Sequence, residues 1–151
     1  MENRANPVDA WHLSLEKNDP NILYDVLDDS FEFFSPAVFK SKEKYMGFIY
    51  LMAASETFLG KDFSYKREII GEDNAVLEFE CTINDVAVNG VDLFKWNEDN
   101  KFTEMKVMIR TEKALDAVKS VSYTHLRAHE TVQDIVCRLL LEKKKGGGGG
   151  G

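Results

Sequence analysis

The stretch GVDLFKWNEDNKFTEMKVMIR, from Gly90 to Arg110, decides the fold. It contains two strand-like runs that are joined by a polar turn at Asn97 to Asn100. Alternation with a period of two is typical of a strand with one buried face, so the stretch predicts two neighbouring antiparallel strands. The first run carries an acid, Asp92, among apolar neighbours. A carboxyl group in such a setting either titrates abnormally or binds something.

The residues before this stretch continue the same pattern. From Lys61 onward apolar and polar residues alternate, with polar turns at residues 71–74 and at Asn84-Asp85. The clearest run has Leu77, Phe79, Cys81 and Ile83 on one face. The segment from Lys61 to Arg110 therefore predicts a meander of long antiparallel strands.

The N-terminal part has helical spacing instead. Three helices are predicted: one opened by Asn6-Pro7, one capped by Asp19 with Pro20 as its first residue, and one from Ser41 to about Phe58. A short aromatic strand, residues 31–34, lies between the second and third. Helices followed by a meander imply an α+β domain in which the helices pack on one face of a curved sheet.

The tail, residues 120–151, has a different character. VSYTHLRAHET, from Val121 to Thr131, resembles a translated transposase-end sequencing adapter, and the Ile135 to Glu142 run resembles the flow-cell primer that follows it, with one departure. Gly146 to Gly151 corresponds to repeated GGG codons. We therefore predict a natural domain over residues 1–119 with an incomplete C-terminal helix that starts near Thr111, followed by a non-native tail. The alternative is a genuine C-terminal helix with a glycine-rich linker.

Charge and cysteine content exclude several classes of function. Residues 120–151 carry 5 of the 19 basic and 3 of the 26 acidic residues, so residues 1–119 hold 14 basic and 23 acidic residues and a net charge of −9. This charge argues against sequence-independent binding to nucleic acid or to an anionic membrane. No signal peptide or membrane span is visible. Cys81 is the one cysteine before the tail, which favours a reducing compartment and a cytoplasmic location.

Three segments carry a resemblance to a known family: NDPNILYDVLDDSFEFFSP (18–36), GVDLFKWNEDNKFTEMKV (90–107) and MIRTEKALDAV (108–118). Over residues 7–119 the chain resembles the nuclear transport factor 2-like superfamily, and within it the SnoaL-like proteins. The resemblance implies a cone in which a curved antiparallel sheet wraps around three N-terminal helices on its concave face, as in cystatin-like folds, with a pocket at the wide end. Some members are enzymes, and many others only bind or dimerise.

The ketosteroid isomerase pattern within this superfamily gives specific expectations. Asp92 corresponds to the protonated acid of the oxyanion hole in those enzymes. Trp11 stands where they have the oxyanion tyrosine, and it keeps an N–H donor but is no acid. Ser35 before Pro36 stands where they have the basic aspartate. Because two of three functional positions depart, proton abstraction has no obvious agent and steroid isomerisation is not expected.

The candidate site residues follow from this resemblance and from the inward face of the strand that carries Asp92. Ligand-binding residues are predicted to be Trp11, Ser35, Tyr45, Phe48, Asp92, Phe94, Met105 and Val107. Asp92 and His12 are the candidate catalytic residues. The alternatives are a structural acid at Asp92 and a core-edge histidine at His12. No metal site is expected once the tail histidines and Cys137 are set aside.

The function that fits these residues is binding of a small, mostly apolar molecule, without a cofactor. Two alternatives remain open. One is a cofactor-independent isomerase, hydrolase or cyclase that uses Asp92 and His12, and the other is a non-catalytic dimerisation module. The outer strand face, with Met108 and Arg110 beside Glu104 and Lys106, predicts a homodimer; the alternative is a solvated surface.

Overall fold

The computed structural model describes residues 6–58 and 62–126. Its elements are α1 (Pro7–Lys17), α2 (Pro20–Val26), β1 (Leu27–Phe34), β2 (Lys42–Glu43), α3 (Lys44–Phe58), β3 (Ser64–Ile70), β4 (Asn74–Ile83), β5 (Val86–Trp96) and β6 (Phe102–Arg110). A further helix covers residues 112–126. The predicted α+β class and the order of elements are confirmed.

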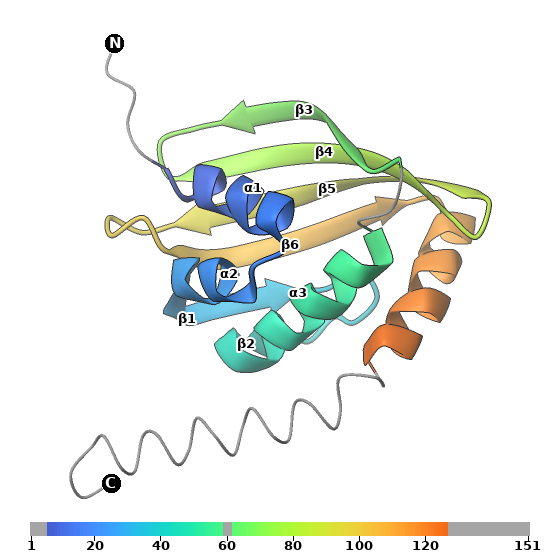
Figure 1. The fold of residues 1–151 in the computed structure, drawn as a ribbon, viewed down its shortest axis with the longest axis horizontal. Coiled ribbons are helices and arrows are strands. Elements are labelled where there is room, and N and C mark those ends of the chain that lie inside the picture. The colour runs from blue at the N-terminus through green and yellow to red at the C-terminus, as the bar shows by residue number, and fades with distance from the viewer. Residues whose placement is uncertain (1–5, 59–61, 127–151) are drawn as a thin grey trace, which may run out of the picture.

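All strands belong to one six-stranded sheet with the order β2-β1-β6-β5-β4-β3 (Figure 1). Strands β3 to β6 form the predicted antiparallel meander. The expectation of a wholly antiparallel sheet is wrong at one ladder, because β1 pairs with β6 in parallel, with Phe33 opposite Met105. Apolar alternation reports which face a side chain takes but not the direction of its strand, and the long connection through α3 and the meander permits a parallel pair.

The turns and bulges of the meander follow from local sequence. Asn84 and Asp85 have φ values of 50° and 63°. This is the backbone of a tight two-residue hairpin turn, which Asn and Asp tolerate well. The register shifts between Tyr65 and Arg67 and between Lys95 and Trp96. Such bulges increase the local twist, so they help the sheet to curve.

The helices begin close to where the sequence predicts. Asn6 caps α1 by accepting a hydrogen bond from the Val8 amide at 2.9 Å, and Asp19 caps α2 by accepting one from the Asn21 amide at 2.9 Å. The predicted cap of the third helix is wrong. Ser41 instead donates to Glu32 Oε2 at 2.9 Å, and the next two residues pair with β1 as β2 before α3 begins.

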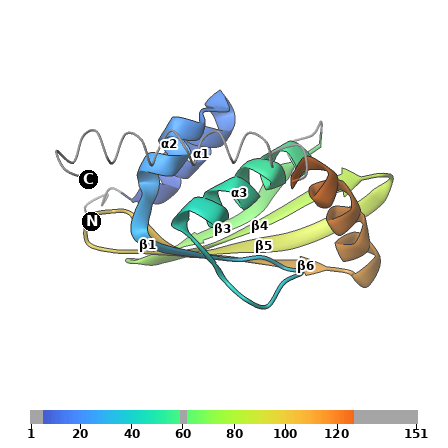
Figure 2. The same cartoon turned by 90° about the horizontal axis from the view of Figure 1, so that it is seen from below.

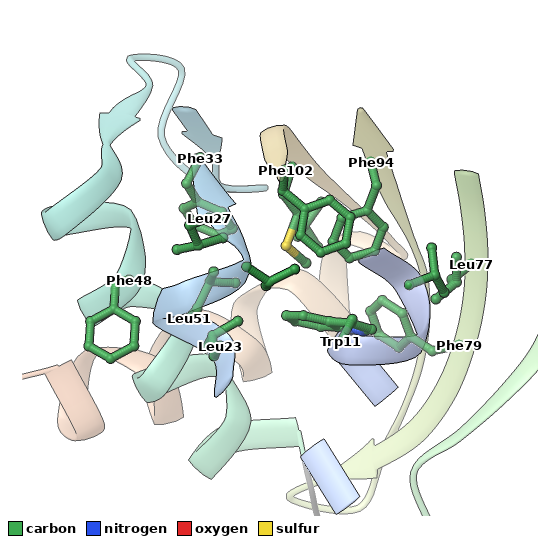
Figure 3. Close-up of a cluster of buried hydrophobic side chains, with 14 of the residues drawn as sticks. Trp11, Leu23, Leu27, Phe33, Phe48, Leu51, Leu77, Phe79, Phe94 and Phe102 are labelled. Carbon is green, nitrogen blue, oxygen red and sulfur yellow. The ribbon is translucent and has the colours of Figure 1, made fainter. Parts of the chain in front are cut away.

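Helices α1, α2 and α3 lie on one side of the sheet, as the edge view shows, and the helix at residues 112–126 stands at one end of it (Figure 2). The apolar alternation of β4 and β5 faces them, so Leu77, Phe79, Val88 and Phe94 are buried. Trp11 projects from α1 into this cluster (Figure 3). The core therefore fills the space between the concave face of the sheet and the helices.

The helix at residues 112–126 crosses the predicted end of the natural domain at Lys119. Ala114 and Val118 are buried in the core, and Val121 and Leu126 pack against it. Ser122 Oγ donates to Thr57 Oγ1 at 3.2 Å. The adapter origin of residues 120–151 stays a prediction, and His129, Cys137 and the glycine run lie outside the described residues.

Candidate functional site

Asp92 lies on the inner face of β5. The strand alternates, so Val88, Gly90, Asp92, Phe94 and Trp96 all turn toward the helices. The Asp92 side chain is 5% exposed. Its neighbours along this face are apolar apart from Gly90, as the sequence predicts. The structure thus places an ionisable group inside the core, where its charged form is poorly solvated.

A chain of hydrogen bonds holds this carboxyl group. Trp11 Nε1 donates to the Tyr65 hydroxyl oxygen at 2.9 Å, and the Tyr65 hydroxyl donates to Asp92 Oδ2 at 2.8 Å. The three residues come from α1, β3 and β5. Among the residues that the structure describes, no cation pairs with Asp92. Tyr65 is therefore its immediate partner, and Trp11 acts through Tyr65.

Tyr65 is the site residue that sequence reasoning missed. Alternation places it on the inner face of its strand, but many inward aromatic residues share that property. Its position beside Asp92 depends on the order of three strands and on the bulge after Tyr65. None of these features is encoded in the spacing of apolar residues, so the sequence offered no signal that distinguished Tyr65.

Burial decides whether Asp92 and Tyr65 are protonated. Loss of water raises the pKa of Asp92 from 3.8 to about 7, although the hydrogen bond from Tyr65 acts in the opposite direction. Burial, together with the negative charge of Asp92, holds the pKa of Tyr65 well above 10. Below pH 7 both side chains are therefore neutral, and Asp92 carries a proton that it can donate.

The Asp92 side chain lines a small hollow, with about 50 Å³ open to the centres of water molecules. Since one water needs roughly 10–15 Å³ by this measure, the hollow holds a few waters or a small organic group. Ser55 and Asp92 are its polar side chains besides the indole of Trp11. The full wall consists of Trp11, Leu15, Phe33, Leu51, Ala54, Ser55, Phe58, Phe63, Phe79, Asp92, Met105 and Val107. We call this space the Asp92 hollow.

Four of the predicted ligand-binding residues, Trp11, Asp92, Met105 and Val107, meet at the Asp92 hollow. The other four lie elsewhere. Ser35 lines a neighbouring hollow, and its hydroxyl accepts a hydrogen bond from the Val38 amide at 2.9 Å.

The remaining three, Tyr45, Phe48 and Phe94, belong to the core or pack against it. Phe94 packs edge-on against Trp11, with ring centres 5.2 Å apart. Phe48 packs against Tyr24, and Tyr45 is a partly buried residue at the edge of the core. None of them is among the residues that line the Asp92 hollow.

His12 lies beside Tyr65 and does not line the Asp92 hollow. Its ring meets Tyr65 edge-on with centres 5.4 Å apart, and Nε2 is hydrogen-bonded to Glu68 Oε1 at the protein surface. Tyr65 thus contacts both candidate catalytic residues, and the structure does not bring His12 to the cavity that Asp92 faces.

Neither a metal site nor a membrane-spanning helix is present among the described residues. Within residues 6–58 and 62–126, no group of three His, Cys, Asp or Glu side chains is arranged to hold a metal ion. His125 instead pairs with Glu56 at 3.1 Å. No helix in the described part of the chain is long and apolar enough to cross a membrane.

The fold is similar to several solved structures. A steroid delta-isomerase from Pseudomonas aeruginosa superimposes with a TM-score of 0.77 and 22% sequence identity, over 85% of this chain and 97% of that chain. An uncharacterised protein with a cystatin-like fold from Silicibacter pomeroyi gives a TM-score of 0.74 and 20% identity, over 87% and 92%. A putative SnoaL-like polyketide cyclase from Jannaschia gives 0.61 and 13% identity, over 78% and 97%.

No protein-family model and no curated protein sequence matches the chain. At identities of 22% and below, these similarities show a common fold alone. The order of the elements and the curved sheet agree with the resemblance seen in the sequence. The chain therefore has an α+β fold similar to that of solved proteins described as cystatin-like, nuclear transport factor 2-like and SnoaL-like.

Proposed function

We propose that this protein binds a small, mostly apolar molecule in the Asp92 hollow, and that neutral Asp92 donates a hydrogen bond to an oxygen atom of that molecule. The observation that carries the proposal is the buried carboxyl group on the wall of a hollow. Tyr65 occupies Oδ2, and no other described residue contacts the carboxyl group through a hydrogen bond.

The energetics of an unpaired donor support this assignment. A protonated carboxyl group has one O–H donor, and a buried donor without a partner costs about 1–3 kcal/mol. A ligand oxygen that accepts this hydrogen bond removes that cost. The apolar wall around it favours a molecule whose remaining surface is hydrocarbon. A neutral ketone, aldehyde or alcohol has the required chemistry, whereas a carboxylate ligand would be repelled once Asp92 ionises.

The affinity for a neutral ketone is expected to depend on pH. For 2-pentanone, binding to the wild-type protein stays constant below pH 6 and weakens about tenfold per pH unit above pH 7, because ionised Asp92 has no proton to donate. Titration of the ketone into ¹⁵N-labelled protein, followed by NMR at several pH values, measures this affinity. The Asp92→Asn variant is the control, since its amide donates at every pH and its binding should not vary. A wild-type affinity that is equal at pH 6 and pH 9 contradicts the proposal.

The competing function is a cofactor-independent isomerase, hydrolase or cyclase in which Asp92 transfers a proton with the help of His12. A pKa of about 7 suits an acid or base at neutral pH, which is the observation in favour of this reading. The Asp92→Asn variant separates the two functions. It abolishes turnover if Asp92 transfers a proton, but it leaves ligand binding largely intact if Asp92 only donates a hydrogen bond. Mass spectrometry of small molecules retained by the purified protein would identify the ligand.

We also propose that two copies associate through the outer face of the sheet. Ile69, Val76 and Leu93 form a row across β3, β4 and β5, and Val91 pairs with Met108 beside it. Ile69 is 58% exposed and Met108 is 51% exposed. Apolar side chains that adjoin one another across four strands form a surface that a second copy would cover.

The Leu93→Lys variant is expected to weaken this dimer at least a hundredfold, because a charge would be buried in the middle of the row. Light scattering at micromolar concentration, together with sedimentation, measures the change. Thr82→Lys is the matched control, since Thr82 is exposed on the same face of β4 but lies outside the row. A wild-type protein that is monomeric at this concentration rules out the dimer.

We also propose that the protein is located in the cytoplasm. Cys81, the one cysteine among the described residues, is a buried free thiol. Burial raises its pKa to about 11, so it stays protonated and unreactive at neutral pH. A cysteine that forms no disulfide within the described residues is usual in a reducing compartment, and this supports the proposed location.

A further inference from the structure

The loop between β1 and β2, residues 35–41, carries a fully exposed aromatic side chain. Of the large apolar side chains in the described part of the chain, Phe39 is the most exposed. In the edge view this loop bends to the side of the sheet that faces away from α1, α2 and α3 (Figure 2). An aromatic ring in water is stabilised when another surface covers it. The loop therefore presents an anchor that its own copy does not use.

The charge of this loop is opposite to that of the domain. Residues 35–42, SPAVFKSK, contain Lys40 and Lys42 and no acidic residue, whereas residues 1–119 have a net charge of −9. Lys40 is exposed, and within residues 6–58 and 62–126 it makes no hydrogen bond or ion pair. The tip of the loop thus combines an exposed ring with an unpaired positive charge.

A groove with a volume of about 620 Å³ lies on the outer face of the sheet. Ser64, Glu80, Asn89 and Arg110 form one row across β3, β4, β5 and β6, and all four line it. Asn89 is two residues before Val91, so the groove adjoins the apolar row through which we propose that two copies associate. We call it the outer groove.

The wall of the outer groove contains more acidic than basic residues. Its charged members are Asp62, Lys66, Glu78, Glu80 and Arg110. Asp62 and Glu78 accept hydrogen bonds within the same copy. Lys66 and Glu80 are exposed, and neither has a hydrogen bond or an ion pair to any other residue that the structure describes. The groove therefore offers an acid to a lysine and a lysine to an aromatic ring.

Strand pairing places the loop and the outer groove at the same end of the sheet. Strands β1 and β6 are parallel, with Phe34 opposite Lys106, so β1 runs on into the loop in the direction in which β6 runs toward Arg110. The loop joins β1 and β2 at one lateral edge, whereas β3 and β4 form the other. A twofold axis along the strands, between two stacked outer faces, keeps the ends of the sheet and exchanges its edges. Each loop is then brought over the groove of the other copy.

We infer that the loop at residues 35–41 of each copy docks in the outer groove of a second copy, with Phe39 beside the partner's Lys66 and Lys40 paired with the partner's Glu80. The opposite charges of loop and groove favour a second copy of this chain as the occupant. This inference rests on the proposed association of two copies, and it adds the segment that each copy contributes. Thr82 is one row nearer to the β4-β5 turn than Glu80 and lies outside the contact.

The Phe39→Ser variant is expected to weaken the dimer at least a hundredfold, because each dimer loses two buried rings and each ring contributes roughly tenfold or more. Sedimentation over a range of protein concentrations measures the dissociation constant. The substitution does not disturb the core, since Phe39 is fully exposed. Leu13→Ser is the control, because Leu13 is an exposed apolar residue on α1, on the other side of the sheet. It is expected to leave the dimer within twofold of the wild type.

Reversal of the paired charges shows whether the contact joins two copies. Lys40→Glu and Glu80→Lys are each expected to weaken the dimer at least tenfold, because like charges then meet at both contacts. An equimolar mixture of the two variants is expected to dimerise within threefold of the wild type. In a mixed dimer the reversed loop meets the reversed groove, and the other loop and groove are native. Thr82→Lys is the control for an added charge and is expected to stay within twofold of the wild type.

The outcomes separate this inference from the proposed association. If Leu93→Lys dissociates the dimer but Phe39→Ser and the two charge reversals do not, the copies meet through the sheet faces alone and only this inference is overturned. The same conclusion follows if mixing the two charge-reversal variants restores no affinity. A wild-type protein that is monomeric at micromolar concentration overturns both the association and the inference.

Discussion

The Asp92→Asn variant is expected to be more stable than the wild-type protein at pH 8, by about 3 kcal/mol. Folding raises the pKa of this carboxyl group from 3.8 to about 7, mainly because burial removes water from the charged form. A change of this size corresponds to roughly 4 kcal/mol between the two protonation states. The neutral amide of Asn avoids that cost, and its oxygen still accepts the hydrogen bond from Tyr65.

The direction of the pH effect follows from which state holds the proton. Below pH 3.8 the carboxyl group is protonated in both the folded and the unfolded protein. Between pH 3.8 and about 7 the unfolded chain has released the proton while the folded protein keeps it, so the stability contributed by Asp92 falls as pH rises. Above pH 7 the full cost of the buried charge is present. The difference between variant and wild type therefore grows from pH 4 to pH 7 and then levels off.

Urea denaturation of both proteins at pH 4, 6 and 8 measures this difference as a free energy of unfolding. Asp116→Asn serves as the control, because Asp116 is exposed on the helix at residues 112–126 and its replacement removes the same formal charge. The control is expected to track the wild type within about 0.5 kcal/mol at each pH. If the free energy of unfolding differed between Asp92→Asn and the wild type by the same amount at every pH, Asp92 would ionise in the folded protein at no cost in stability. That result would remove the basis for a neutral donor in the hollow.

The Gly90→Ala variant is expected to destabilise the protein by about 3 kcal/mol or more. A Cβ atom at this position would lie 2.5 Å from Phe79 Cζ and 2.7 Å from the backbone oxygen of Met108. Gly90 faces Phe79 across the β4-β5 ladder, two residues before Asp92. The missing side chain makes room for the Phe79 ring, and that ring is part of the wall of the Asp92 hollow.

Neither the Phe79 ring nor the Met108 backbone oxygen can move away from an added Cβ atom at low cost. Met108 is held in the β5-β6 ladder, and Phe79 is a buried residue that also contacts Phe58 and Phe63. Chemical denaturation at one pH measures the loss. The matched control is Gly71→Ala in the β3-β4 turn, where the nearest atom would be the Asn74 side-chain oxygen at 3.1 Å. That control is expected to cost no more than about 1 kcal/mol. If Gly90→Ala were as stable as this control, the β4-β5 ladder would be able to accommodate a Cβ atom beside Asp92 at low cost.

The sequence predicted those features that depend on residues close together in the chain. Alternation from Leu77 to Ile83 marked the inner face of β4, Asn84-Asp85 marked its turn, and Asp19-Pro20 marked the start of α2. The same local logic placed Asp92 on the inner face of its strand. Side-chain direction along a strand and the capping of a helix are decided within a few residues, which is why these predictions held.

Contacts between distant segments were decided only by the tertiary structure. The parallel pairing of β1 with β6 and the position of Tyr65 beside Asp92 each join residues far apart in sequence. Strand order, register and bulges bring these segments together, and the spacing of apolar residues does not predict any of these three features. The sequence by itself therefore determined the fold class and the strand face on which Asp92 lies, while the packing of strands β3, β4 and β5 gave that acid its partner and its raised pKa.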